Sequence, residues 1–381
     1  MKSRDDSGHA VRVRADIAEF SLLVRILAND AAGTARNLEA DPGLLDSLAE
    51  TCIRSGLSVA LFRALEASPM QSALEPARIG RLEEALRRQT ERQRVLERAL
   101  FRMAQLFDSQ KQPFILLKGP YLSRRFFGGA VGREYADIDL LVPDADRFKA
   151  CALIESAGYR RQSRIFLHEG LTRFFVHAFD YHSRDARMDL HWRLCRHPSL
   201  HIDEKRLWAT RASFRIDGYD FNVLSDEYEI VFAALSLLRD IERGRPKAKN
   251  VVDLVRIAMT VDASLDWDKV LSARDGTARP VRRVLRLCLE KSDSHDLAKN
   301  LAEALARHGR GHESVSNGSA EAPLRFKPGF LSLGNKIWAA RAYETSLLSW
   351  LSWWALSLPF RLAVHRKPPL RFRQSGRGLS C

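Results

Sequence analysis

The spacing of the hydrophobic residues changes twice along this chain, and this restricts the possible folds more than any other feature. From residue 20 to residue 107, apolar residues recur every three or four positions, the period of an amphipathic α-helix. Residues 114–117 and 138–142 are instead short apolar runs, typical of buried β-strands. Helical spacing returns after Ser225. The sequence therefore predicts an α+β fold, with a small mixed sheet flanked by N-terminal and C-terminal helical regions.

This pattern divides the chain into six expected segments. They are a disordered polar N-terminus (1–15), a helical region (16–110), a core that contains the sheet (111–224), a second helical region (225–306), a flexible linker (307–328) and an amphipathic aromatic helix with a basic tail (329–381). Within the core, we expect helices over 120–127 and 145–157 and a hairpin formed by residues 174–181 and 187–194.

Two aspartates interrupt the second apolar run. Asp137 and Asp139 stand two residues apart, so a strand would present both carboxylates on one face. Ile138 and Leu140 would then point into the core. Adjacent carboxylates repel each other, but a divalent cation between them removes the repulsion, and Mg²⁺ prefers oxygen ligands. The spacing favours a metal site, although an isolated pair of this kind often only caps a turn.

The end of the first apolar run has the features of a phosphate-binding segment. Gly119 follows the expected strand, and Pro120 suits the first position of a helix because proline lacks an N–H group. Backbone amides at a helix start favour phosphate, and Lys118 and Arg133 could add positive charge. We expect Lys118, Gly119 and Arg133 to bind substrate.

A third acid lies in the second strand of the expected hairpin. Asp189 shares a strand face with His191, whereas Met188 and Leu190 occupy the opposite face. An acid on a largely apolar strand needs a partner, and in-line transfer at phosphorus through two metal ions needs a third ligand. We expect Asp189 to be that ligand and His191 to contact substrate; the alternative is a surface ion pair of Asp189 with a neighbouring arginine such as Arg187.

Together, these motifs resemble the uncharacterised nucleotidyltransferase family of the DNA polymerase beta-like superfamily. The likeness rests on residues 116–119, 132–133, 137–142 and 189–192. It implies a polymerase-beta-like nucleotidyltransferase core in which Asp137 and Asp139 bind metal and Asp189 completes a catalytic triad. It also implies that the loop at Gly119 carries the triphosphate. Pro120 departs from the family pattern, because many superfamily members have a serine there whose hydroxyl contacts phosphate.

The resemblance implies an enzyme that transfers a nucleoside monophosphate from a nucleoside triphosphate to a hydroxyl or phosphate acceptor and releases pyrophosphate. Mg²⁺ or Mn²⁺ would be the cofactor. The acceptor stays open between a small molecule, an RNA and a protein, the last two as in toxin-like transferases. The downstream helix of the family often carries an acid, for which Asp253 is the loose match here. The alternative function is a catalytically inactive basic adaptor that binds nucleic acid or a membrane surface.

Charge and cysteine content bear on partners and compartment. Sixty-one Lys and Arg against 47 Asp and Glu give a formal net charge of +14, which favours polyanions, nucleotides or an anionic membrane. A solvated basic surface explains the same excess equally well. The five cysteines are scattered singly, so we expect neither a zinc site nor disulfides. The first fifteen residues lack the apolar core of a secretory signal, so a cytoplasmic location is expected.

An aromatic-rich apolar stretch lies near the C-terminus and is followed by a basic tail. A membrane-spanning helix needs about 20 apolar residues, and the serines, proline and arginine in this stretch make it a poor candidate. Residues 345–373 therefore favour peripheral contact with the inner face of a membrane. Docking of the same helix on the protein's own core is the equal alternative.

Overall fold

The structure is a computed structural model, and its description covers residues 19–308 apart from 20, 29, 42, 67–73, 163–175, 196, 198, 199, 201, 244, 245, 274, 275 and 293. The expected N-terminal segment 1–15 and the aromatic segment 329–381 lie outside the described residues. The last described helix, α14, ends at His308, so it includes the first two residues of the expected linker 307–328. The rest of that linker is also outside the description.

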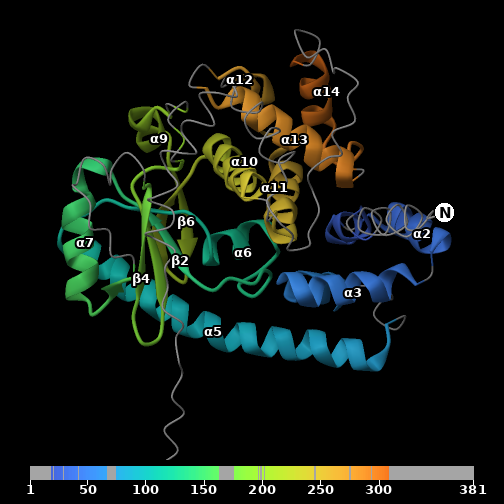
Figure 1. Ribbon diagram of the computed structural model, residues 1–381, viewed down its shortest axis with the longest axis horizontal. Helices are drawn as coiled ribbons and strands as arrows, with labels where there is room; N and C mark the ends of the chain where they lie inside the picture. The colour runs from blue at the N-terminus through green and yellow to red at the C-terminus, as the bar shows by residue number, and fades with distance from the viewer. Residues whose placement is uncertain are drawn as a thin grey trace, which may run out of the picture.

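The described residues before the sheet form helices, as their spacing predicts. Besides the helical residues 21–27, these are α2 (Ala31–Ala40), α3 (Leu44–Ser55), α4 (Ser58–Glu66) and α5 (Pro76–Ser109). With 34 residues, α5 is about 51 Å long. It runs beneath α3 and continues along the sheet, where it packs against α7 (Arg147–Ser156) (Figure 1). This one helix therefore connects the helical half of the molecule to the sheet.

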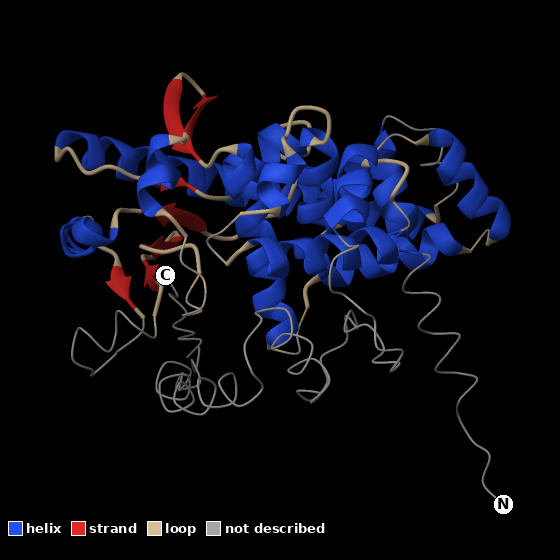
Figure 2. Ribbon diagram, turned by 90° about the horizontal axis from the view of Figure 1, so that it is seen from above, coloured by secondary structure: helices blue, strands red, loops and turns tan. Residues whose placement is uncertain are grey.

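Seven strands form one mixed sheet in the order β3-β4-β5-β2-β1-β7-β6. They are β1 (Ile115–Leu116), β2 (Ile138–Leu141), β3 (Arg160–Arg161), β4 (Ala178–His182), β5 (Arg187–His191), β6 (Ala212–Ile216) and β7 (Tyr219–Val223). Two neighbouring pairs, β2 with β5 and β1 with β7, are parallel, and the other neighbours, including β1 with β2 between them, are antiparallel. The strands gather at one end of the molecule, and helices fill the rest (Figure 2). The α+β class is confirmed.

The two faces of the central strands bury different sets of apolar residues. Ile138 and Leu140 of β2 and Leu190 of β5 are fully buried in the main hydrophobic core. Alternate residues of the same strands face a smaller apolar cluster, which includes Leu141 of β2 and Phe232 of the helix after the sheet. The expected period-2 alternation is confirmed in both strands. Asp139 and Asp189 belong to the face of the smaller cluster.

The hairpin β6–β7 is absent from the elements expected from sequence. Its turn is Asp217-Gly218, and both residues have positive φ, 47° and 86°. This conformation is that of a two-residue hairpin turn, for which Asp-Gly is a strong sequence signal. The Asp-Gly pair could therefore have located the hairpin, although the mixed polar sequence of β6 obscured it. The expected hairpin of β4 and β5 is confirmed, since the two strands are antiparallel.

The helices after the sheet complete the core. They are α10 (Asp226–Glu242), α11 (Ala248–Val261), α12 (Trp267–Leu271), α13 (Ala278–Ser292) and α14 (Lys299–His308). Fourteen of the 17 residues of α10 are buried, so it is an interior helix, packed against α11 and α13. One hydrophobic cluster extends from the first helices through the sheet to α14. None of the helices in the described ranges is long and apolar enough to cross a membrane.

Two short helices cover the sheet, α6 (Pro120–Phe126) between β1 and β2, and α9 (Glu204–Ala209) between β5 and β6. The expected helix 120–127 is therefore confirmed, and the expected helix 145–157 corresponds to α7. In Figure 1, α6 lies between the sheet and α11, and it contacts both β6 and α11. This position fixes Gly119, the residue before α6, at the exit of β1.

Candidate active site

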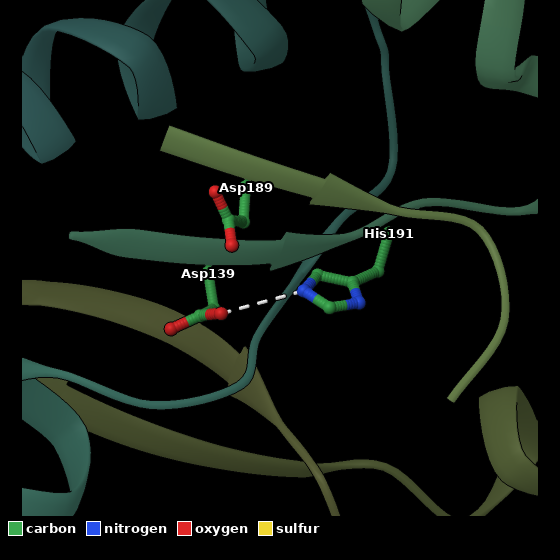
Figure 3. Close-up of side chains that lie close together, drawn as sticks. All are labelled: Asp139, Asp189 and His191. Carbon is green, nitrogen blue, oxygen red and sulfur yellow. Dashed lines mark hydrogen bonds and ion pairs between the residues drawn. The ribbon is translucent and has the colours of Figure 1, made fainter. Parts of the chain in front are cut away.

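Three acids lie in a row across three neighbouring strands. Asp139 of β2 is in register with Asp189 of β5, and Asp189 is in register with Asp180 of β4. His191 follows two residues after Asp189 on the same strand face, and its Nε2 lies 3.3 Å from Oδ1 of Asp139 (Figure 3). The sheet therefore brings together residues that are up to 52 positions apart in the chain.

Asp139, Asp189 and His191 form a candidate metal centre. One ligand atom from each of the three residues lies within 4.8 Å of the others. Two carboxylates and one imidazole are a donor set that suits divalent cations such as Mn²⁺, and the carboxylates alone suit Mg²⁺. The expectation that Asp139 and Asp189 act together is compatible with this geometry. His191, which was expected to contact substrate, lies among these candidate ligands.

The electrostatics of the two carboxylates differ. Burial and the neighbouring Asp139 and Asp180 raise the pKa of Asp189 to about 9. Burial also acts to raise the pKa of Asp139, but the hydrogen bond with His191 and the charge of Lys118 outweigh it, and the net pKa is lowered. The fold therefore holds two carboxyl groups so close together that only one of them favours ionisation without a cation. A divalent cation would permit both to be charged, so the residues fit a metal.

Asp137 lies one residue before β2, at the edge of this group. It is half-buried, and burial and the charge of Asp139 raise its pKa. Its charge also contributes to the raised pKa of Asp189. The structure thus places Asp137 beside the acid row but outside the three-residue metal set. Asp180 lies at the other end of the row from Asp139 and was not predicted from the sequence. Its position directly across from Asp189 in the predicted hairpin could have identified it.

Positive charge lies on the side of the site formed by α10. Lys118 has its Nζ 3.4 Å from Oγ of Ser236 and 4.6 Å from the centre of the Phe232 ring. Burial lowers the pKa of Lys118, and Asp139 opposes the change. Arg239, a second cation that acts on Lys118, lies on α10 with its Nη1 3.3 Å from Nε2 of His177. Arg239 was not predicted as a site residue. The sequence feature that could have identified it is a charged residue within an apolar helical segment.

Gly119 adopts a backbone conformation that favours glycine. Its φ is +70°, and it directly precedes Pro120, the first residue of α6. A Cβ at Gly119 would lie 3.6 Å from the carbonyl oxygen of Asp137 and from the Tyr135 ring, so space alone would permit one. The positive φ is therefore the reason for glycine. This places the backbone of Gly119 next to the acids, as the sequence pattern predicts.

Arg133 is engaged in a buried ion pair. Its Nε and Nη2 donate to the two carboxylate oxygens of Asp253, each at 2.5 Å, and the side chains are only 5% and 6% exposed. Arg133 was expected to bind substrate, but this bidentate pair directs its guanidinium to α11. Lys249 lies nearby and donates to the carbonyl of Glu134. Arg133 and Asp253 thus connect the segment before β2 to α11.

The profile of one protein family matches this chain. The family is described as uncharacterised nucleotidyltransferase, and the match covers residues 42–290. This range includes the whole sheet, Lys118, the acid row and His191. No curated protein matches the sequence significantly. Because the match covers more than half of the chain, the protein belongs to this family of uncharacterised nucleotidyltransferases.

Proposed function

We propose that this protein transfers a nucleoside monophosphate from a nucleoside triphosphate to a hydroxyl or phosphate acceptor, with a divalent cation as cofactor. The observation that carries the proposal is the in-register pair of Asp139 and Asp189 with His191 beside it. A polymerase-beta-like core is the corresponding proposal for the fold. The residues of this site have the chemistry that nucleotidyl transfer needs: ligands for a cation, nearby positive charge, and a glycine at the strand exit.

In this reaction, an acceptor oxygen forms a bond to the α-phosphorus while the bond to the pyrophosphate oxygen breaks. A bound divalent cation would neutralise the phosphate charge and lower the pKa of the acceptor hydroxyl. Asp139, Asp189 and His191 would hold the cation, and Asp137, beside them, would be a further ligand once substrate is bound. The acceptor proton would leave to a carboxylate of the row or to water.

Two cations of the chain are placed to take phosphate charge. Lys118 is the closer one to the acids, because it acts electrostatically on Asp139, and Arg239 adds charge from α10. Lys118 lies against Ser236 and Phe232, which are weak partners for an ammonium group. A triphosphate would add negative charge at this half-buried lysine, beyond that of Asp139. Arg133 is assigned a positioning role through Asp253 instead of direct phosphate contact.

The acceptor is best found by transfer of label. We would incubate the protein with each α-³²P-labelled nucleoside triphosphate, Mg²⁺ or Mn²⁺ and cell extract, and separate small molecules, RNA and protein. Asp139→Asn tests the site, and Asp185→Asn, an exposed acid in the turn of the β4–β5 hairpin, is the matched control. Label that depends on Asp139 but not on Asp185 is expected. Absence of any label that depends on Asp139 would reject the proposed function.

A further inference from the structure

A cavity lies at the C-terminal end of α6, whereas Gly119, beside Asp137, precedes the N-terminal end of the same helix. The volume of the cavity is about 410 Å³, and it is lined by the glycine loop 128–132, by Phe127 and Leu27, and by two arginines, Arg63 of α4 and Arg256 of α11. Ligand pockets for small molecules have about 300–1,000 Å³. The lining includes no acidic residue. The cavity is therefore large enough for a small ligand, and its two charged lining residues are both arginines, of which Arg63 also pairs with Glu66.

Arg256 is the stronger indication of an anion site. Its Nε and Nη1 donate to the carbonyl oxygens of Phe126 and Leu27, at 2.7 and 2.5 Å. These bonds use helix-end carbonyls, and within the described ranges no carboxylate forms an ion pair with Arg256. Burial lowers the pKa of Arg256, with no opposing contribution from an acid. A half-buried guanidinium without a counter-ion favours an anionic ligand, because charge burial is otherwise unfavourable.

The glycine loop is held in shape by one side chain. Oγ of Ser123 accepts hydrogen bonds from the backbone N–H groups of Gly132 and Arg133, at 2.9 and 3.2 Å. The same hydroxyl is within donating distance of the carbonyls of Gly129 and Ala130. Ser123 is fully buried, so the loop is organised before any ligand arrives. Arg63 Nε, which donates to the carbonyl of Val131 at 3.3 Å, holds the loop from the α4 side.

The cavity adjoins the active site through the buried ion pair. Gly132 lines the cavity, and the next residue, Arg133, pairs with Asp253. Asp253 lies one helical turn before Arg256 on the same face of α11, so the ion pair and the cavity are neighbours. The candidate metal centre consists mainly of acids, whereas the charged residues that line the cavity are both arginines. The two sites would therefore take ligands of different kinds.

We propose that this cavity binds the phosphate group of a small molecule, held by Arg256 and Arg63, in a site separate from the metal centre. Guanidinium groups form charge-assisted hydrogen bonds to phosphate oxygens, and a guanidinium with free N–H groups suits this geometry. The proposal does not require a metal or a nucleotide at the acid row. It would hold for a protein whose transfer reaction differs from the one proposed above.

The test is titration of the full-length protein with inorganic phosphate by calorimetry, in EDTA so that no cation occupies the acid row. Gly129 lines the cavity, and a Cβ there would meet no atom within 4 Å at an ordinary φ, so Gly129→Phe should be tolerated and its ring should fill part of the cavity. Gly80→Phe is the matched control, since Gly80 is an exposed glycine of α5 with equal space around it. We expect phosphate affinity to fall about tenfold or more in Gly129→Phe and to stay unchanged in Gly80→Phe.

A second variant pair keeps the test decisive if Gly129→Phe fails to fold. Arg63→Gln removes one cation of the cavity, and Arg88→Gln removes an arginine in a similar intrahelical ion pair on the exposed surface of α5. Arg63→Gln should weaken phosphate binding and Arg88→Gln should not. Asp139→Asn should leave phosphate binding intact, which separates this site from the transfer reaction. No phosphate binding in the wild type, or equal binding in all variants, would overturn the proposal.

Discussion

Asp139 and Asp189 lie directly opposite each other on the adjacent parallel strands β2 and β5. Two carboxylates at directly opposed positions destabilise a sheet when both are ionised, and here Asp180 of β4 extends the same row. A slip of one residue in the pairing would place an apolar side chain across from each acid, so the register itself keeps the carboxyl groups together. The stability that this arrangement forfeits is consistent with a role for the acids in binding a cation.

The acid pair gives the first prediction. Asp139→Asn and Asp189→Asn each remove a candidate ligand, and loss of several kcal/mol of transition-state stabilisation corresponds to a transfer rate lower by about a thousandfold. Mn²⁺ binding, followed by electron paramagnetic resonance, should weaken in both variants. Asp185→Asn should match the wild type in both measurements. Wild-type Mn²⁺ affinity in Asp139→Asn would show that the cation site lies elsewhere.

His191 gives a prediction about metal preference. Imidazole is a better ligand for Mn²⁺ than for Mg²⁺, so His191→Gln should lower Mn²⁺ affinity by about tenfold and Mg²⁺ affinity by less. The measurement is competition between the two ions in the wild type and the variant. His308→Gln is the control, because His308 lies far along the chain on α14 and pairs with the exposed Asp268. Equal loss of affinity for both ions would indicate that His191 only orients Asp139.

The side of the site formed by α10 gives a prediction about substrate binding. Lys118→Met should raise the KM for the nucleoside triphosphate by about tenfold or more, because it removes a half-buried cation beside the acids. Lys149→Met, at an exposed lysine of α7, is the control. Steady-state kinetics with varied triphosphate would measure both. A lower kcat with an unchanged KM would mean that Lys118 acts only in the transition state.

The ion pair between Arg133 and Asp253 predicts a strong effect on folding. Removal of one partner leaves a buried uncompensated charge, so Arg133→Met should lower the free energy of unfolding by about 3–5 kcal/mol. The exposed pair of Arg215 and Asp220 is the control, and Arg215→Met should change the free energy of unfolding by at most about 1 kcal/mol. Urea denaturation measures both. If the double variant Arg133→Met/Asp253→Leu were no more stable than Arg133→Met, the unpaired charge of Asp253 would not be the cause of the lost stability.

The burial of Glu229 leads us to predict that folding stability depends on pH. This glutamate of α10 is 1% exposed, and burial raises its pKa from 4.5 to about 8. Between these values the unfolded chain ionises the group and the folded protein does not, so folding stability falls as pH rises, by up to about 1.4 kcal/mol per pH unit. Glu229→Gln abolishes the fall and should therefore gain stability over the wild type from pH 4.5 to pH 8.

Urea denaturation at pH 5, 6.5 and 8 in EDTA would measure this gain, which should be small at pH 5 and on the order of a few kcal/mol at pH 8. Glu91→Gln, at an exposed glutamate of α5, should show no such trend. A constant difference between Glu229→Gln and the wild type at all three pH values would contradict the raised pKa.

Most of the fold was predictable because local patterns carry it. Period-3.6 spacing located the long helices on both sides of the sheet, and period-2 alternation assigned the buried and half-buried residues of β2 and β5 correctly. The hairpin β6–β7 was missed because its strands mix charged and apolar residues, so only the Asp217-Gly218 turn carried a signal. The short helices α9 and α12 were missed because five or six residues are too few to show a helical period.

The candidate site was predictable only in part, and for a physical reason. The sequence alone determined which residues could be ligands, because carboxylate spacing on a strand and the chemistry of Lys118 are local properties. Only the tertiary structure decided which of them meet, because strand order and register depend on packing of the whole sheet. The pairing of β2 with β5 brought Asp189 and His191 to Asp139, and packing of α11 directed Arg133 to Asp253.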